Sequence, residues 1–69
     1  MKISARNVLP GTVTAIVRGP VTAEVTLEVA PGLQIVSTIT TASADSLGLK
    51  VGAQVYGVIK ASSVMIATD

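Results

Sequence analysis

The chain carries at positions 21–29 the segment VTAEVTLEV, in which apolar and polar residues alternate without a break. Successive side chains of a β-strand point to opposite faces, so this alternation predicts a strand with one face buried and the other in water. The expected buried face holds every second residue of the segment: Val21, Ala23, Val25, Leu27 and Val29.

Turn residues flank this strand on both sides. Gly19-Pro20 predicts a turn before it, and Ala30-Pro31-Gly32 predicts a tight hairpin into a strand at Leu33–Thr40. Val, Ile and Thr fill 25 of the 69 positions, a composition typical of β-sheet proteins. The other segments that we expect to form strands are Ile3–Leu9, Gly11–Val17, Gln54–Ala61 and Val64–Ala67.

One segment departs from the strand pattern. Thr41–Gly48 offers a hydroxyl N-cap, an early Asp45 and a terminating glycine, which predicts one or two helical turns. Five or six strands with one short helix predict an all-β fold, a small Greek-key barrel of the OB type. We expect a single domain over residues 1–69, because no linker or internal repeat interrupts the chain.

Composition predicts an oligomer. Apolar residues make up 49% of the chain and the mean hydropathy is +0.70. A domain this short buries only about 60% of the surface that its unfolded chain exposes. Some of the apolar surface is therefore expected to be buried against other chains. With no cysteine and no histidine, disulfides and a structural zinc site are excluded.

Membrane and nucleic-acid partners are not expected. Apolar runs such as Ala15-Ile16-Val17 are far shorter than the roughly 20 residues of a membrane-spanning helix. Arg6 stands where a signal peptide would need its apolar stretch, so we expect a cytoplasmic protein. A net charge of +1 is too small for a polyanion partner, and Tyr56 is the sole residue able to stack on a base.

The sequence predicts no enzyme. Glu24 and Glu28 would lie about 13 Å apart on one strand, too far for a pair of catalytic carboxylates. No histidine or cysteine is present to activate a serine or threonine. A Ser–Lys arrangement that uses Lys60 is the one catalytic alternative left open.

Two short segments pair a cationic residue with hydroxyl side chains, Ser4-Ala5-Arg6-Asn7 and Lys60-Ala61-Ser62-Ser63, and the predicted helix start at Thr40–Ser43 adds N–H donors. Together they offer the two positive charges and the several donors that a dianion requires. The alternative is structural: the first two are then solvated strand ends and the third is only a helix cap. Arg18, in a turn, and Lys50, between elements, are interpreted as ordinary surface residues.

The same blocks, together with Ile39–Ser43, Ser46–Leu49 and Val58–Ser62, resemble the Mop (molbindin) domain, a module that binds molybdate and tungstate. The match runs over nearly the whole chain, with the blocks in the family's order and at about its spacing. The resemblance implies an OB-like barrel whose protomers exchange a strand to form dimers, with three dimers in a hexamer. It also implies oxyanion sites at subunit interfaces.

The resemblance assigns ligand-binding roles residue by residue: Ser4 and Arg6, then Thr40 and Ser43, then Lys60, Ala61 and Ser62. Asn7 is interpreted as structural. We expect Arg6 and Lys60 to converge on one dianion across a protomer boundary. The family has a second type of site, for which the N–H groups of Gly19 and Val21 are candidates, although Pro20 removes a donor there.

The predicted function is reversible molybdate storage in the cell, with no chemistry on the ligand and no cofactor. Tungstate has nearly the same size as molybdate, so either anion fits the prediction. Sensing and delivery require the same site as storage. Two alternatives remain open: a β-barrel scaffold for a protein partner, and a generic oxyanion binder without preference for molybdate.

Overall fold

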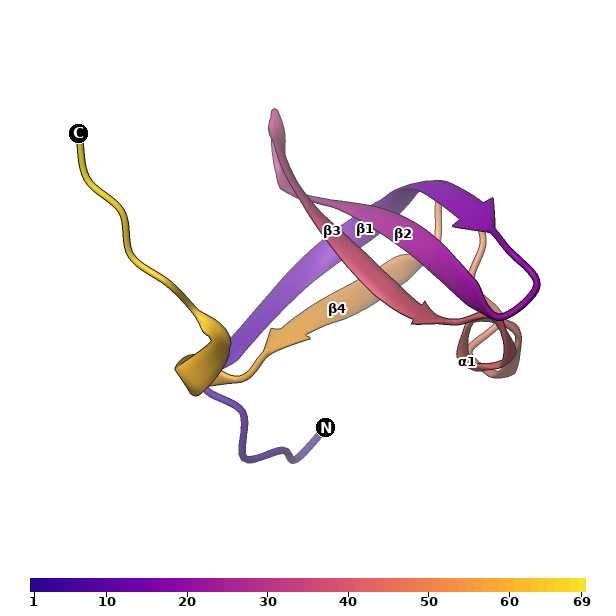
Figure 1. Ribbon diagram of the computed structural model, residues 1–69, viewed down its shortest axis with the longest axis horizontal. Coiled ribbons are helices and arrows are strands. Elements are labelled where there is room, and N and C mark those ends of the chain that lie inside the picture. The colour runs from indigo at the N-terminus through magenta and orange to yellow at the C-terminus, as the bar shows by residue number, and fades with distance from the viewer.

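Four strands form one antiparallel sheet in the computed structural model, which describes residues 1–69 (Figure 1). The strand order is β3-β2-β1-β4, and a six-residue helix follows β3. Neither helical element is long and apolar enough to cross a membrane. The elements in chain order are β1 (Asn7–Arg18), β2 (Thr22–Ala30), β3 (Leu33–Thr40), α1 (Thr41–Ser46), β4 (Gln54–Ile59) and the 3₁₀ turn η1 (Ala61–Ser63).

The core lies on one face of β2, as its alternation predicts. Ala23, Val25 and Leu27 are only 1%, 3% and 4% exposed, and Val13 of β1 is fully buried beside them. Val21 is 70% exposed because it precedes β2 in the turn, so its prediction as a core residue is wrong. Partly buried residues pack around this core: Ile16, Val29, Ile35, Ile39, Leu49, Ala53 and Val55.

β1 is a single strand of 12 residues, where two strands, Ile3–Leu9 and Gly11–Val17, are predicted from the sequence. Its first half, up to Thr12, pairs with β4, and its second half, from Thr12 onward, pairs with β2. Pro10 therefore has a partner strand on one side only, which is the setting in which a sheet tolerates proline. Ile3 to Arg6 lie outside any strand, so the predicted first strand begins four residues too early.

The predicted hairpin and helix are present. β2 and β3 pair along their length, and Gly32 turns between them with φ of 76°, a conformation that glycine adopts without steric cost. α1 begins at the predicted residue, Thr41, and ends at Ser46, two residues before the predicted end. β4 begins as predicted at Gln54 and ends two residues early, because η1 begins at Ala61.

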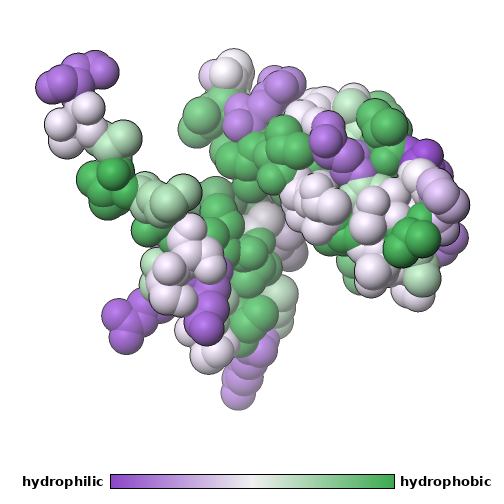
Figure 2. Space-filling model, in the orientation of Figure 1, coloured by the Kyte–Doolittle hydropathy of each residue, from purple (hydrophilic) through white to green (hydrophobic).

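An apolar groove of about 620 Å³ runs between the two edge strands, β3 and β4, which are not hydrogen-bonded to each other. Gly57 of β4 allows this approach: a Cβ there would lie 2.8 Å from Ile35 Cδ1 of β3. Figure 2 shows apolar surface along the middle of the molecule. Within one chain the sheet is thus strongly curved but open along this line.

The residues after η1 form no strand, so the prediction for Val64–Ala67 is wrong. They extend away from the sheet (Figure 1), and Met65 and Ile66 are 92% and 87% exposed. No strand of the same chain lies beside them, and a strand needs a partner for its backbone groups. The chain therefore forms four strands, not five or six.

Candidate functional site

The two segments that pair a cation with hydroxyl residues meet in one hollow. The pairing of Asn7 with Ile59 places the start of β1 opposite the end of β4, and Asn7 Nδ2 donates to Ile59 O at 3.3 Å. The residues before Asn7 and after Ile59 therefore leave the sheet side by side. They enclose an open hollow of about 470 Å³, lined by Ile3, Ser4, Ala5, Arg6, Lys60, Ala61 and Ser62.

The short turn η1 forms one wall of the hollow. Its hydrogen bonds run from Ser63 N to Lys60 O, at 2.8 Å, and from Val64 N to Ala61 O, at 3.3 Å. The first N–H groups of such a turn have no carbonyl partner within it, so those of Ala61 and Ser62 are free to donate to a ligand. Ala61 adds little bulk beside these groups.

The hollow is cationic. Arg6 and Lys60 both line it, and none of its lining residues is acidic. The carboxylate of Asp45 is paired with Arg18 instead. Arg6 supplies a planar fork of donors and Lys60 a compact positive charge, while Ser4 and Ser62 add hydroxyls. This arrangement can hold an anion that accepts several hydrogen bonds, and both charges come from a single chain.

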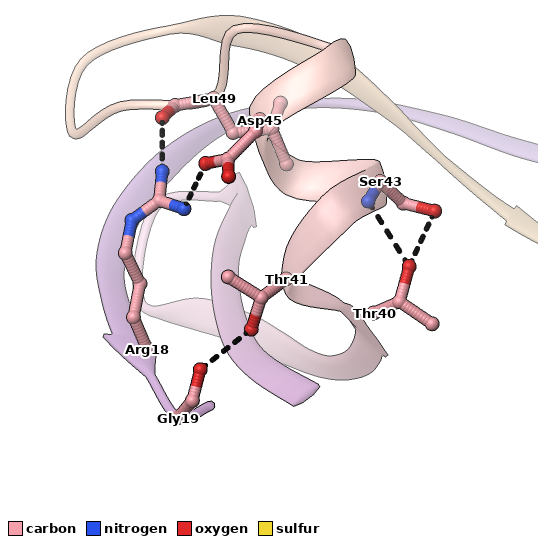
Figure 3. A network of polar contacts seen from close by, with 7 residues as sticks. All are labelled: Arg18, Gly19, Thr40, Thr41, Ser43, Asp45 and Leu49. Atoms are coloured by element: carbon pink, nitrogen blue, oxygen red, sulfur yellow. Dashed lines mark hydrogen bonds and ion pairs between the residues drawn. The ribbon is translucent and has the colours of Figure 1, made fainter. Parts of the chain in front are cut away.

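The third segment lies elsewhere. Thr40 and Ser43 are at the start of α1, at the end of the sheet opposite η1 and the N-terminus (Figure 1). Thr40 Oγ1 accepts from Ser43 N at 3.0 Å, and the Thr40 hydroxyl donates to Ser43 Oγ at 2.7 Å (Figure 3). Within one chain, the Thr40 hydroxyl therefore serves as the helix cap, and neither residue reaches the hollow.

Arg18, interpreted from the sequence as an ordinary surface residue, connects β1 to α1 and to the loop that follows α1. Its Nη1 lies 2.6 Å from Asp45 Oδ1 of α1, and its Nη2 donates to Leu49 O at 3.3 Å (Figure 3). Thr41 adds a second link, because its hydroxyl donates to Gly19 O at 2.8 Å. These partners are 22 to 31 positions apart, so no local pattern in the sequence could have revealed them.

The turn between β1 and β2 uses one of its two candidate donors internally. Gly19 N donates to Thr22 O at 2.8 Å, and a Cβ on Gly19 would lie 2.9 Å from that oxygen. Val21 O accepts from Thr41 N at 2.8 Å, which fixes the turn to α1. The N–H of Gly19 is thus not free for an anion in this conformation.

Comparison with known proteins identifies the family. Residues 3–66 match the family model described as TOBE domain. The chain is 50% identical to molybdenum-pterin-binding protein 1 of Clostridium pasteurianum, over 96% of this chain and 97% of that protein. Longer relatives exist: the chain is 45% identical to the molybdenum transport protein ModE of Herbaspirillum seropedicae but spans only 26% of its length.

Two solved structures share the fold. A molybdate-binding protein from Sporomusa ovata superposes with a TM-score of 0.92 at 37% identity, over 99% of this chain and all of that one. The cytoplasmic molybdate-binding protein ModG, solved with molybdate bound, gives 0.90 at 49% identity, over 94% of this chain and 46% of that one. The chain therefore belongs to the TOBE domain family, among the molybdenum-pterin-binding (Mop) proteins.

Proposed function

We propose that this protein binds molybdate in the hollow between its N-terminal residues and η1. One observation supports this above all: Arg6 and Lys60, 54 positions apart in the chain, line the same small hollow together with hydroxyl side chains. The relatives support the identity of the ligand, since their names describe molybdate or molybdenum-pterin binding. Those names describe binding and no catalytic activity.

Each residue of the site has a distinct role. Arg6 and Lys60 neutralise the two charges of molybdate, and charge-assisted hydrogen bonds are the stronger class. Ser4 and Ser62 donate through hydroxyls, and Ala61 donates through its backbone N–H. The ligand is held reversibly and is not transformed, so the protein stores or buffers the anion in the cytoplasm.

Size provides selectivity against sulfate. Sulfate is smaller than molybdate and cannot reach every donor at once, and each unmade buried hydrogen bond costs about 1–3 kcal/mol. Two such losses correspond to roughly a hundredfold weaker binding. Tungstate, with nearly the size of molybdate, binds at the same site.

A second protomer completes the site. Every predicted ligand residue is solvent-exposed in the single chain, and an exposed hydrogen bond to an anion gains little over water. Thr40 and Ser43 of another copy complete the site: the hydroxyl of Ser43 donates to the ligand, and Thr40 holds that side chain through its own hydroxyl. The exposed apolar segment after η1 fits the apolar groove of that copy as an exchanged strand, which closes the barrel. Three such dimers form a hexamer.

Calorimetric titration of three alanine variants with molybdate tests the site. Arg6→Ala and Lys60→Ala each lose tight binding, since one charge of the dianion is left without a partner. Lys50→Ala is the matched control: it removes the same charge from an exposed lysine outside the hollow and binds as the parent does. Unchanged affinity in both site variants contradicts the assignment, and sulfate binding as tight as molybdate binding reduces the function to generic anion capture.

The apolar groove favours a second candidate function, a scaffold for a different protein. A groove lined mainly by apolar residues is typical of docking surfaces, and an oxyanion would then be incidental. Equilibrium dialysis against molybdate, followed by metal analysis, separates the two functions: a scaffold retains no molybdenum.

A further inference from the structure

Helix α1 is too short to be stable without support from the rest of the chain. It has six residues, and Ala44 is the only one of them that is buried. Isolated helices of this length are unstable in water, so contacts outside the helix must fix it. Two of its residues, Thr41 and Asp45, make polar contacts with the end of β1 and the turn that follows it.

These contacts hold both ends of α1. At its start, the N–H and the hydroxyl of Thr41 each donate to a carbonyl of the turn, at 2.8 Å. At its other end, Arg18 Nη1 lies 2.6 Å from Asp45 Oδ1, and Nη2 donates to Leu49 O at 3.3 Å (Figure 3). We call the two contacts of Arg18 the Arg18 bridge. With both ends held, the orientation of α1 relative to the sheet is fixed.

Ser43 lies between these two points, and its hydroxyl is prepared to donate. Thr40 Oγ1 accepts the Ser43 N–H at 3.0 Å and gives its own hydrogen to Ser43 Oγ at 2.7 Å. A hydroxyl group has one hydrogen to donate, so that of Ser43 is left for an acceptor from outside the chain. The Arg18 bridge lies on the opposite side of α1 from Ser43 (Figure 3) and can affect this donor only through the helix.

We propose that Arg18 is a positioning residue for the anion site: through Asp45 it holds α1 in the orientation in which Ser43 donates to an anion bound by another copy. This inference rests on the proposed function, in which Ser43 of one copy completes the hollow of the next. Arg18 does not line the hollow itself. A donor that is fixed before the ligand arrives loses little freedom on binding, and such preorganisation raises affinity.

The expected effect has an upper limit. Affinity falls in proportion to the fraction of the protein whose α1 is in the binding orientation, so the Arg18 bridge cannot contribute more than its own stabilisation of that orientation. An ion pair as exposed as this one changes an equilibrium by at most about fivefold. We therefore expect loss of the bridge to weaken molybdate binding by roughly twofold to fivefold.

Asp45→Asn tests the bridge by the sign of the change. The substitution removes a negative charge from a protein of net charge +1, so long-range attraction alone would strengthen the binding of a dianion. Loss of the bridge instead weakens molybdate binding in calorimetry by the expected twofold to fivefold. Glu24→Gln is the matched control, because it removes the same charge from an exposed residue outside the ion pair, and it binds no more weakly than the parent. An Asp45→Asn affinity equal to or above that of the parent overturns the proposal.

A double-mutant cycle shows whether the bridge acts through Ser43. In a Ser43→Ala protein the donor is gone, so adding Asp45→Asn causes no further loss of molybdate affinity, and the two losses are not additive. An equal loss in both backgrounds would mean that Asp45 acts by general destabilisation, and it overturns the proposal. A parent protein that gives no heat with molybdate contradicts the proposed function instead, and Ser43→Ala binding as the parent does contradicts the role of Ser43 within it.

Discussion

One hydroxyl, that of Thr40, holds the start of α1. It accepts the Ser43 N–H and donates to Ser43 Oγ, so a single side chain engages two groups at the first helical turn. The preference of hydroxyl residues for this position made a cap in this segment predictable. The identity of the capping residue was not predictable, because the end of β3 decides where the helix begins.

Thr40→Val tests this role, because it replaces the hydroxyl group by a methyl group. The substitution keeps the shape of the side chain and removes the cap, and the free energy of unfolding falls by about 1 kcal/mol. Urea denaturation measures the loss. Thr38→Val, an identical exchange at an exposed position of the same strand, serves as the control, and an equal effect of the two would show that the cap contributes nothing.

The residues of the candidate site were predictable by type but not by location. Arg6 and Lys60 stood out because charges are few and each has serine neighbours. Their meeting within one chain follows from the pairing of Asn7 with Ile59, which are 52 positions apart. Local patterns do not encode such a register. The sequence therefore did not predict that the two charges line one hollow within a single chain, and their convergence on a ligand across a protomer boundary stays a prediction.

At the scale of elements, the alternation of β2 and the glycine and proline turns predicted the central hairpins. The sequence predicted two strands, one on each side of Pro10, where the structure has the single strand β1. The strand continues through Pro10 since it changes partner two residues later, at Thr12. The segment Val64–Ala67 has the composition of a strand, yet composition cannot supply a neighbour to pair with.

The ion pair between Arg18 and Asp45 connects the end of β1 to α1, and its contribution is predictable. The two side chains are 41% and 67% exposed, and ion pairs at such positions contribute at most about 1 kcal/mol. In low salt, Asp45→Asn lowers the free energy of unfolding by less than about 1 kcal/mol. The difference from the parent disappears near 1 M salt, where the charges are screened.

Urea denaturation at two salt concentrations measures this effect. Glu24→Gln is the control, because Glu24 is an exposed carboxylate outside this ion pair. A loss that persists at high salt would mean that Asp45 acts through its hydrogen bonds and not through its charge.

For the whole molecule, the presence of uncovered apolar surface was predictable and its position was not. Composition alone predicted that a chain of 69 residues with 49% apolar content cannot bury all of its apolar surface within itself. The structure locates that surface in the groove between the edge strands and in the segment after η1. The groove arises from the curvature of the sheet, which depends on all four strands together, and the segment after η1 is exposed because no strand of the same chain lies beside it.

Binding of molybdate by an assembled protein should raise its thermal stability. A ligand at about 100 times its dissociation constant adds roughly 2.7 kcal/mol to the free energy of unfolding. For a chain of this length that corresponds to an increase in Tm of about 10–20 °C. Differential scanning calorimetry at several protein concentrations measures it, and a dependence of Tm on concentration indicates that unfolding is linked to dissociation.

Two controls accompany the thermal experiment. Lys60→Ala gains no stability from molybdate, and the parent gains little from sulfate at the same concentration. If sulfate and molybdate raise Tm equally, the anion acts through general screening and not through the hollow.

The change of partner within β1 also has a consequence for the order in which the chain folds. The second half of β1 meets β2 after a short turn, so this contact closes a small loop and forms early. The first half waits for β4, the last strand to leave the ribosome. Until then its backbone groups are unpaired, and this interval is when a nascent copy is most vulnerable to aggregation.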